Sequence, residues 1–341
     1  MTKSVISVIP GDGIGPEVIE SAIASIKATG LKNVEFNYLD FGAHRYNKGE
    51  PSITTDEYES IAKSDAILLG AIGWPTVERG VLEREILLGL RFTFGFWANL
   101  RPVFDAEKDI DILIVREISE GNYIGEGGIA HRDTKNAIAT QGSITSWRGV
   151  ERITRLAFER AQKRKSKLTW VHKANVLNFS GPLWNQVVND VAKEFPKVSL
   201  DYMHIDTMCM ELIKNPHKYD VILTDHMFGD ILSDVAAGVT CHGIGAASSG
   251  MYNFVQNNDS KLKKAFAMFE PVHGSAPKRT GKNTANPFAA ILAASMMLDF
   301  LGYTKEANML EDACRQTKHE DNLTETTRNV INLIKRQSKD I

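Results

Sequence analysis

The order of predicted elements near the start of the chain most constrains what it can fold into. Residues 5–10 form an apolar run typical of a strand, residues 11–16 are a glycine-rich turn, and residues 17–29 are predicted helical. Further strands are predicted over residues 33–40 and 64–70. Strands that alternate with helices predict an α/β fold with helices on the faces of a sheet.

The glycine turn does not carry the Rossmann spacing. Its glycines are spaced G-x-G-x-G with Pro16 next, whereas a dinucleotide-binding turn has G-x-G-x-x-G. We therefore expect an α/β protein without a Rossmann nucleotide site.

Composition excludes several classes of function. The 341 residues are enough for two domains, and the net charge of −2 gives no electrostatic reason to expect nucleic acid or an anionic membrane as a partner. The three cysteines lack metal-ligand spacing, and their odd number argues against a disulfide framework. The sequence shows no signal peptide and no apolar stretch long enough to span a bilayer. These features favour a cytoplasmic protein.

The middle of the chain has a different pattern. Strands are predicted over residues 111–115 and 168–172, and a long helix over residues 148–164. Residues 125–146 alternate short polar and apolar stretches broken by glycines, which indicates an extended β arm that packs against a partner. No linker is recognisable, which favours one domain inserted within another.

A pair of carboxylates follows a predicted strand in the second half of the chain. Residues 219–224 are apolar and partly β-branched, Gly229 is predicted to break the strand, and Asp230 to open a helix. Asp234 lies on the same helical face, so both carboxylates can point at one spot. Such oxygen ligands suit Mg²⁺ or Mn²⁺. The alternative is that Asp230 only caps the helix and Asp234 is a solvated surface residue.

A compact loop of small residues precedes another predicted helix. Residues 273–277 leave mostly backbone at the surface, so a flat ring such as adenine can pack there, with His273 available to stack. Asn286 is predicted to cap the buried helix over residues 288–300, with Pro287 at its first position. The alternative is a structural turn before a core helix.

Together these features resemble the isocitrate/isopropylmalate dehydrogenase family of metal-dependent β-decarboxylating dehydrogenases. The matching motifs run in family order over nearly the whole chain. They are Gly11-Asp12-Gly13-Ile14-Gly15-Pro16-Glu17, Asn99-Leu100-Arg101-Pro102, Val115-Arg116-Glu117, Tyr123 before Gly125-Glu126, Val171-His172-Lys173-Ala174-Asn175-Val176, Gly229-Asp230 through Ser233-Asp234, and Glu270 through Asn286-Pro287.

The resemblance implies a two-domain, non-Rossmann α/β fold in which a central domain is inserted in a domain that holds both termini. The expected boundaries are residues 1–96 plus 241–341 for the terminal domain and 97–240 for the central domain, with the β arm at about 125–146. Family members are typically homodimers with interlocking arms, and their active site lies in a cleft that closes over the substrate.

The implied reaction takes hydride from C2 of a 2-hydroxy-dicarboxylate and releases its 3-carboxylate as CO₂. Arg91, Arg101 and Arg116 match the carboxylate clamps of the family, since a guanidinium group can bind a carboxylate through two hydrogen bonds. Asp230 and Asp234 match two ligands of the divalent metal, which stabilises the enolate as a Lewis acid.

Three further matches complete the implied site. Asp206 matches the third metal ligand and Lys173 the group that acts on the substrate hydroxyl, and both are expected from the other subunit of a homodimer. Lys173 needs a pKa lowered by burial and by the metal for this role. Tyr123 matches the residue that protonates C3 of the enol.

The implied cofactor is NAD or NADP, bound through the adenosine loop. NAD-using relatives carry Asp where this chain has Lys278, followed by Arg279, and two cations attract a 2′-phosphate that Asp would repel. NADP is therefore favoured. The expected cofactor-binding residues are His273, Gly274, Ser275, Ala276, Pro277, Lys278, Arg279 and Asn286.

Leu87 and Leu88 match the positions that read the side group of the substrate. An apolar wall suits an isopropyl group and would leave a third carboxylate unpaired, which favours the isopropylmalate branch of the family. Arg84 stands where many members of that branch have Glu, so malate, tartrate, methylmalate, isocitrate and homoisocitrate stay open as substrates. His226 stands where relatives usually have Asn, and sequence alone gives it no role. A non-catalytic regulatory subunit is a further alternative, although all of the matched acid, base and metal-ligand residues are present.

Overall fold

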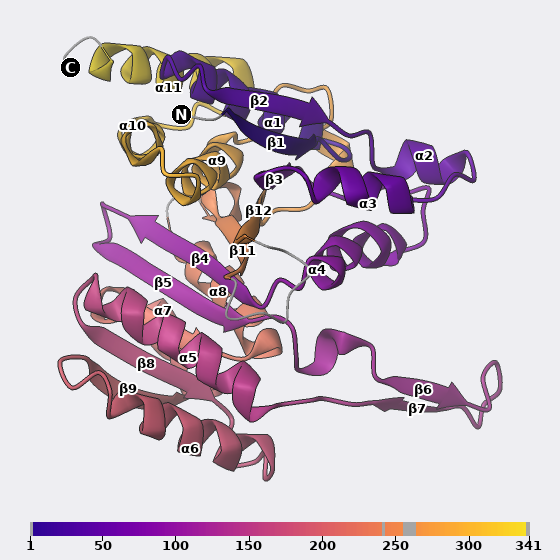
Figure 1. Cartoon of the computed structure of the whole chain (residues 1–341), viewed down its shortest axis with the longest axis vertical. Helices are drawn as coiled ribbons and strands as arrows, with labels where there is room; N and C mark the ends of the chain where they lie inside the picture. Colours follow the sequence, from indigo (N-terminus) through magenta and orange to yellow (C-terminus); the bar gives the residue numbers. More distant parts are fainter. Residues whose placement is uncertain (1–2, 241–242, 255–263, 339–341) are drawn as a thin grey trace. The chain divides into compact units, whose positions relative to one another are not determined.

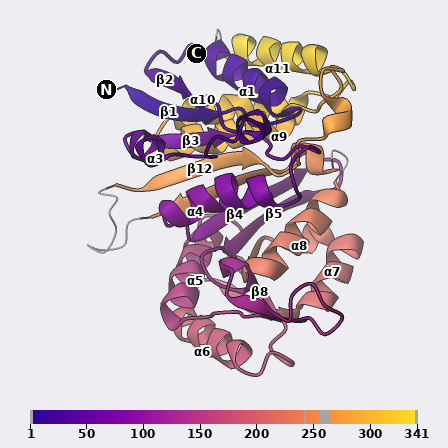
Figure 2. The same cartoon turned by 90° about the vertical axis from the view of Figure 1, so that its right-hand side faces the viewer.

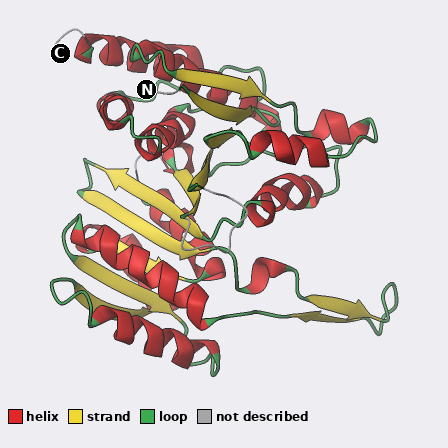
Figure 3. Cartoon of the chain, viewed as in Figure 1, coloured by secondary structure: helices red, strands yellow, loops and turns green. Residues whose placement is uncertain are grey.

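The computed structural model describes residues 3–240, 243–254 and 264–338. The chain divides into two compact units, of which the first holds Met1–Phe96 with His242–Ile341 and the second holds Trp97–Cys241. Strands and helices alternate in both units, so the predicted α/β class is confirmed (Figure 3). None of the described helices has the length and apolar character that crossing a membrane requires.

The first unit is built on a mostly parallel arrangement of strands. Its strand order is β2-β1-β3-β12-β11, with only β12 and β11 antiparallel to each other. The strands are β1 (Ser4–Ile9), β2 (Val34–Tyr38), β3 (Ala66–Leu69), β11 (Ser248–Asn253) and β12 (Phe266–Pro271). The helices and helical turns are α1 (Gly15–Ala28), α2 (Ala43–Asn47), α3 (Thr55–Ile61), η1 (Glu83–Leu88), α4 (Gly89–Thr93), η4 (Gly243–Ala246), η5 (Pro277–Arg279), α9 (Phe288–Phe300), α10 (Thr304–Gln316) and α11 (Leu323–Gln337).

Helix α9 is the centre of the first unit. It is apolar around most of its circumference, as expected of a helix that is covered on all sides. It packs against α1, α10 and β12, and every residue of β3 and β12 is buried as well. The prediction of a buried helix over residues 288–300 is therefore confirmed.

The second unit has the strand order β4-β5-β10-β8-β9, with β4 and β5 antiparallel and the other pairs parallel. The strands are β4 (Ala98–Asp105), β5 (Ile110–Glu117), β8 (Lys167–His172), β9 (Ser199–His204) and β10 (Val221–Thr224). The helices and helical turns are η2 (Asn122–Ile124), α5 (Trp147–Gln162), α6 (Ser180–Ala192), α7 (Ile205–Lys214), η3 (Pro216–Lys218) and α8 (His226–Gly238).

A two-stranded hairpin extends from the second unit. Its strands β6 (Gly127–Ala130) and β7 (Ile138–Gln141) pair antiparallel, and all of their residues are exposed. Figure 1 shows this arm reaching beyond the end of α5 with no other element of the second unit beside it. Ile129 is 47% and Ile138 60% exposed, so the arm carries apolar side chains that its own unit does not cover.

Two predicted helix starts are corrected by the structure. Helix α8 begins at His226 rather than at Asp230, because the side chain of Asp225 accepts a hydrogen bond from Phe228 N at 2.8 Å and caps the helix there. Gly229 and Asp230 therefore lie inside the helix. In α9 the cap position is Pro287 and the first helical residue is Phe288, although Asn286 Oδ1 does accept from Phe288 N at 3.0 Å.

Asp225 and His172 have opposite effects on the pH dependence of folding. Burial raises the pKa of Asp225 to about 6, and burial lowers the pKa of His172, whose Nε2 lies 3.7 Å from Asp225 Oδ2, to about 4. Between pH 3.8 and 6 the folded state keeps a proton that the unfolded chain loses from Asp225, so this group favours folding as the pH falls. Between pH 6.5 and 4 the unfolded chain binds a proton at His172 that the folded protein does not bind. The contribution of His172 to stability is therefore lost as the pH falls through this range.

Replacing Asp225→Asn is expected to remove one of these two effects. The amide keeps the helix cap without a buried charge, so at neutral pH the free energy of unfolding is expected to equal or exceed that of the parent. Between pH 6 and 4 it is expected to fall relative to the parent, because only the effect of His172 remains. Urea unfolding of variant and parent across this pH range measures the difference in free energy of unfolding. The control is Asp56→Asn, at an exposed position of α3. A difference between variant and parent that does not change with pH contradicts the assignment.

Candidate active site

Two buried arginines and a carboxylate form the centre of a cluster in the second unit. Arg101 lies on β4, Arg116 on the neighbouring strand β5, and Asp230 on α8. Arg116 Nη1 is 2.8 Å from Asp230 Oδ1, and Arg101 Nη1 is 3.4 Å from the same oxygen. Because both guanidinium groups are buried, water screens these ion pairs only weakly. The fold thus brings two of the predicted clamps to one of the predicted metal ligands.

The close approach of β5 to α8 depends on Gly229. A Cβ atom at Gly229 would lie 2.6 Å from Arg116 Cγ and 2.9 Å from Arg116 Cδ. Arg116 Nε donates a hydrogen bond to the carbonyl oxygen of His226 at 2.6 Å, and its Nη1 reaches Asp230 four residues later. The guanidinium group therefore spans the first turn of α8 along the side where Gly229 leaves room.

Asp234 extends the cluster by one helical turn. Its Oδ1 is 3.7 Å from Arg101 Nη1, which also donates to Ser233 Oγ at 2.6 Å. Burial raises the pKa of Asp234 most strongly, Arg101 lowers it, and the neighbouring carboxylate of Asp230 raises it further. Two half-exposed carboxylates that repel each other on one helical face fit a divalent cation, whose charge would relieve the repulsion.

Tyr123 joins this cluster from the turn η2. Its hydroxyl donates to Asp230 Oδ2 at 3.3 Å, and the guanidinium carbon of Arg116 lies 5.9 Å from its ring centroid. The ring of His226 lies 4.5 Å away, centroid to centroid. A phenol beside a guanidinium group and a predicted metal ligand can exchange a proton with a bound anion.

Lys173 and Asp206 come together at a different place in the second unit. Lys173 directly follows β8, Asp206 lies in the first turn of α7, and Lys173 Nζ is 2.5 Å from Asp206 Oδ1. This hydrogen bond lowers the pKa of Asp206. Among the described residues of one chain, no three Asp, Glu, His or Cys side chains form a metal-binding group. Asp206 therefore does not complete the pair Asp230 and Asp234 within a single chain.

The predicted specificity residues lie in the first unit. Leu87 and Leu88 are half-buried on the π-helical turn η1, and the buried Arg91 follows on α4. Turns of this type are rare and often occur at functional sites. The segment therefore presents two adjacent apolar side chains one turn away from a guanidinium group.

The predicted adenosine loop rests on the glycine turn of the first unit. Ile14 N donates to Ser275 O at 2.9 Å, and a Cβ atom at Gly13 would lie 2.0 Å from that same oxygen. Ala276 has a φ of 41°, a left-handed conformation that costs a non-glycine residue energy. The glycines thus support the loop, and backbone of residue 275 fills the place where a Rossmann turn would hold a phosphate.

The side chains of this loop leave polar groups available. Burial lowers the pKa of His273, and its Nε2 is buried without a hydrogen-bond partner in the described part of the chain. Lys278 and Arg279 are exposed on η5. Gly274 is exposed as well, so the loop surface is mostly backbone with two cations at its far end.

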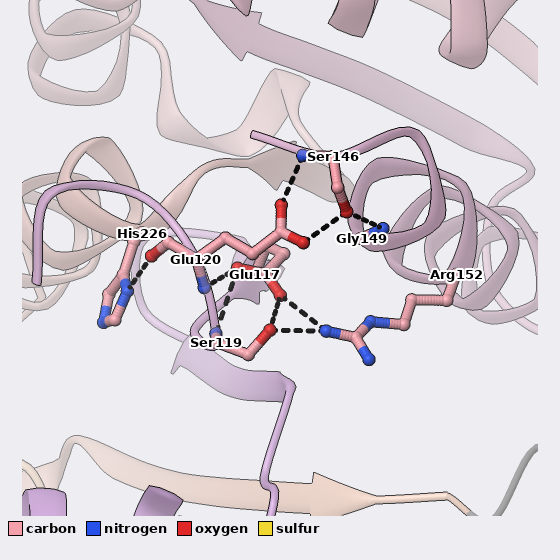
Figure 4. A network of polar contacts seen from close by, with 7 residues as sticks. All are labelled: Glu117, Ser119, Glu120, Ser146, Gly149, Arg152 and His226. Atoms are coloured by element: carbon pink, nitrogen blue, oxygen red, sulfur yellow. Dashed lines mark hydrogen bonds and ion pairs between the residues drawn. The ribbon is translucent and has the colours of Figure 1, made fainter. Parts of the chain in front are cut away.

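Sequence reasoning missed several residues that support the site. Ser233 binds Arg101, and its spacing of three residues from Asp230 could have indicated a shared helical face. Glu117 and Glu120 are held in a polar network with Ser119, Ser146 and Arg152 (Figure 4). No local pattern marks that network, because its members meet only through the fold.

Comparisons with known proteins match nearly the whole chain to one family. The family model described as isocitrate/isopropylmalate dehydrogenase matches residues 5–335. A protein of Corynebacterium urealyticum named 3-isopropylmalate dehydrogenase is 46% identical, with 90% of this chain and 91% of that protein covered. A Streptomyces coelicolor protein of the same name is 44% identical, with 92% of each covered.

Solved structures show the same fold. An isocitrate dehydrogenase from Methylococcus capsulatus aligns with a TM-score of 0.86 at 30% identity, over 97% of this chain and 99% of that chain. A β-decarboxylating dehydrogenase from Thermococcus kodakarensis aligns with a TM-score of 0.80 at 37% identity, over 98% and 96%. The chain therefore belongs to the isocitrate/isopropylmalate dehydrogenase family.

Proposed function

We propose that this protein catalyses the oxidative decarboxylation of 3-isopropylmalate to 2-oxo-4-methylpentanoate and CO₂, with NAD or NADP as hydride acceptor and a divalent metal. The meeting of Arg101, Arg116, Tyr123 and Asp230 carries the proposal, because it unites anion-binding groups, a proton donor and a metal ligand. The relatives from Corynebacterium urealyticum and Streptomyces coelicolor support the choice of substrate by their names.

The arginines are proposed to bind the two carboxylates of the substrate. Arg101 and Arg116 already bridge to carboxylate oxygens of this chain, which shows that their guanidinium groups are oriented for such contacts. Arg91 is proposed as the third clamp. Binding the substrate through fixed, buried cations orients C2 without the cost of ordering flexible side chains.

Asp230 and Asp234 are proposed to hold Mg²⁺ or Mn²⁺, with Asp206 supplied by a second copy of the chain. When bound, the cation supplies Lewis-acid stabilisation of the negative charge on the C2 oxygen as CO₂ leaves. Lys173, also from the second copy, is proposed to act on the proton of the substrate hydroxyl. Tyr123 then gives a proton to C3, so that the C2 ketone is restored and the product is released.

Leu87 and Leu88 are proposed to contact the isopropyl group of the substrate. Because both side chains are apolar, wild-type protein is expected to reduce cofactor with 3-isopropylmalate and Mg²⁺ or Mn²⁺ much faster than with isocitrate or malate. Leu88→Ala is expected to lower kcat/KM for 3-isopropylmalate about 10- to 100-fold, because it removes apolar contacts with the side group. Malate lacks that group, so its rate serves as the internal control. Faster turnover of isocitrate or malate by the wild type would show that the leucines do not select the substrate.

Lys278 and Arg279 are proposed to favour NADP over NAD. Lys278→Asp is expected to lower the ratio of kcat/KM for NADP to that for NAD at least tenfold, because the change replaces attraction of the 2′-phosphate by repulsion, worth about 1–4 kcal/mol per charge at close range. Initial rates with both cofactors measure the ratio. Lys282→Asp, at an exposed position of the same loop, is the matched control. An equal change in both variants would mean that only the net charge of the loop matters.

A homodimer with shared sites is proposed from the exposed surface of the second unit. Met210 and Ile213 on α7 and Ile231 on α8 are 53%, 65% and 48% exposed, and the two helices pack side by side (Figure 2). These side chains and those of the arm are apolar groups that the second unit leaves uncovered, which supports an interface. Asp206 lies on the same helix α7 and binds Lys173, so a partner that covers this surface can receive both residues.

Mixing two strongly impaired variants tests whether the sites are shared. Lys173→Met and Tyr123→Phe are each expected to keep only a small residual rate, since one residue is missing from both sites. Co-expressed, they are expected to recover about a quarter of wild-type activity, because half of the dimers are mixed and each mixed dimer rebuilds one intact site. Purified through a different tag on each variant, the mixed dimer alone is expected to have about half of the wild-type activity per mole, and this activity is the measurement. If no activity returns, Lys173 and Tyr123 serve the same site from one chain.

A further inference from the structure

The turn that carries Tyr123 lies between two glycines. Gly121 and Gly125 flank the turn η2 with φ of 83° and 80°, in the left-handed region that glycine enters easily. Backbone contacts hold the start of the segment, since Gly121 N donates to Ile144 O at 2.8 Å. The hydroxyl of Tyr123 has a long hydrogen bond to Asp230, at 3.3 Å, so the groups packed against the ring contribute to its direction.

His226 contacts the segment that carries Tyr123 at three places. Its Nδ1 is 2.7 Å from the carbonyl oxygen of Glu120, and a Cβ atom at Gly121 would lie 2.9 Å from His226 Cβ. Its ring lies 4.5 Å from that of Tyr123, tilted by 51°. A carbonyl only accepts hydrogen bonds, so Nδ1 must carry the proton. His226 is 1% exposed, which leaves its ring little freedom to move.

Both sides of this contact are anchored. His226 lies in the first turn of α8, where its carbonyl oxygen accepts from Arg116 Nε at 2.6 Å. Glu120 receives a hydrogen bond from Ser146 N at 2.7 Å, and its own N donates to Glu117 Oε2 at 2.9 Å (Figure 4). Arg152 in turn binds the buried Glu117. His226 thus connects the first turn of α8 to the segment that leads from β5 into the turn η2.

We propose that His226 is a positioning residue that orients the ring of Tyr123 through the Nδ1 bond to Glu120 and the contact of the two rings. It touches neither substrate nor metal in this role. It acts on the last step, in which the O–H bond of Tyr123 breaks, a C–H bond forms at C3 of the enolate, the C2 ketone returns, and the negative charge passes to the phenolate of Tyr123. This inference rests on the proposed function.

Two variants separate the two contacts. His226→Asn keeps a donor near Nδ1 but loses the ring, and His226→Phe keeps a ring but loses the donor. Each is expected to lower kcat at least tenfold and to lower KM in proportion, so that kcat/KM changes less than twofold, because only a step after decarboxylation is slowed. His319→Asn, at a half-buried histidine of the first unit that has no proposed role in the site, is the control and is expected to keep the wild-type rate.

The time course of cofactor reduction gives a second readout that a purely structural role would not change. Hydride transfer precedes protonation, so the variants are expected to show a rapid burst of about one reduced cofactor per site before a slow steady state. Adding either change to Tyr123→Phe is expected to lower kcat little further, since both act on one step. A lower kcat without a burst, or full additivity in the double variants, would falsify the inference.

The outcome also distinguishes this inference from the proposed function. A wild-type protein without turnover on any of the tested hydroxy acids would refute the function itself. Normal wild-type turnover with unchanged His226 variants would refute only the positioning role. If His226→Phe does not fold, as judged by its unfolding in urea, the smaller His226→Asn decides the question.

Discussion

The ion pair between Arg116 and Asp230 is the interaction on which the rest of the site depends. Arg116 is 1% exposed, and a buried guanidinium group without a carboxylate partner would be strongly destabilising. The 2.8 Å contact ties β5 to α8, and the hydrogen bond to the carbonyl oxygen of His226 fixes the first turn of the same helix. Asp234 lies one turn further along α8, so its position follows from how α8 is held against β5. Gly229 is the residue that makes the approach possible.

The two units carry different residues of the proposed active site. The second unit gathers Arg101, Arg116, Tyr123 and the α8 carboxylates, so the groups proposed for anion binding and proton transfer share one set of strands and helices. The first unit holds the apolar pair on η1 and the predicted adenosine loop, which rests on the glycine turn through the hydrogen bond from Ile14 N to Ser275 O. Rigid supports of this kind keep reacting groups in place while loops vary between relatives.

Much of this could be predicted from sequence. The strand–turn–helix alternation predicted the α/β class, the unbroken apolar run at 288–300 predicted a buried helix, and the spacing of Asp230 and Asp234 predicted that they share a face. The start of α8 was predicted wrongly, because Gly229 suggested a break whereas Asp225 caps the helix four residues earlier. A glycine inside a helix usually weakens it, but Gly229 leaves room for Arg116, which lies on β5, a strand distant from α8 in sequence.

The sequence by itself determined the class of fold, the family and the residue types available for chemistry, because these follow from local periodicity and from motifs in a fixed order. Only the tertiary structure decided which of those residues meet. It joined Lys173 to Asp206 away from Asp230 and Asp234, and it gave His226 a place against Tyr123 that no motif indicated. The reason is physical: such contacts join residues on different strands and helices, and their geometry depends on packing that no local pattern records.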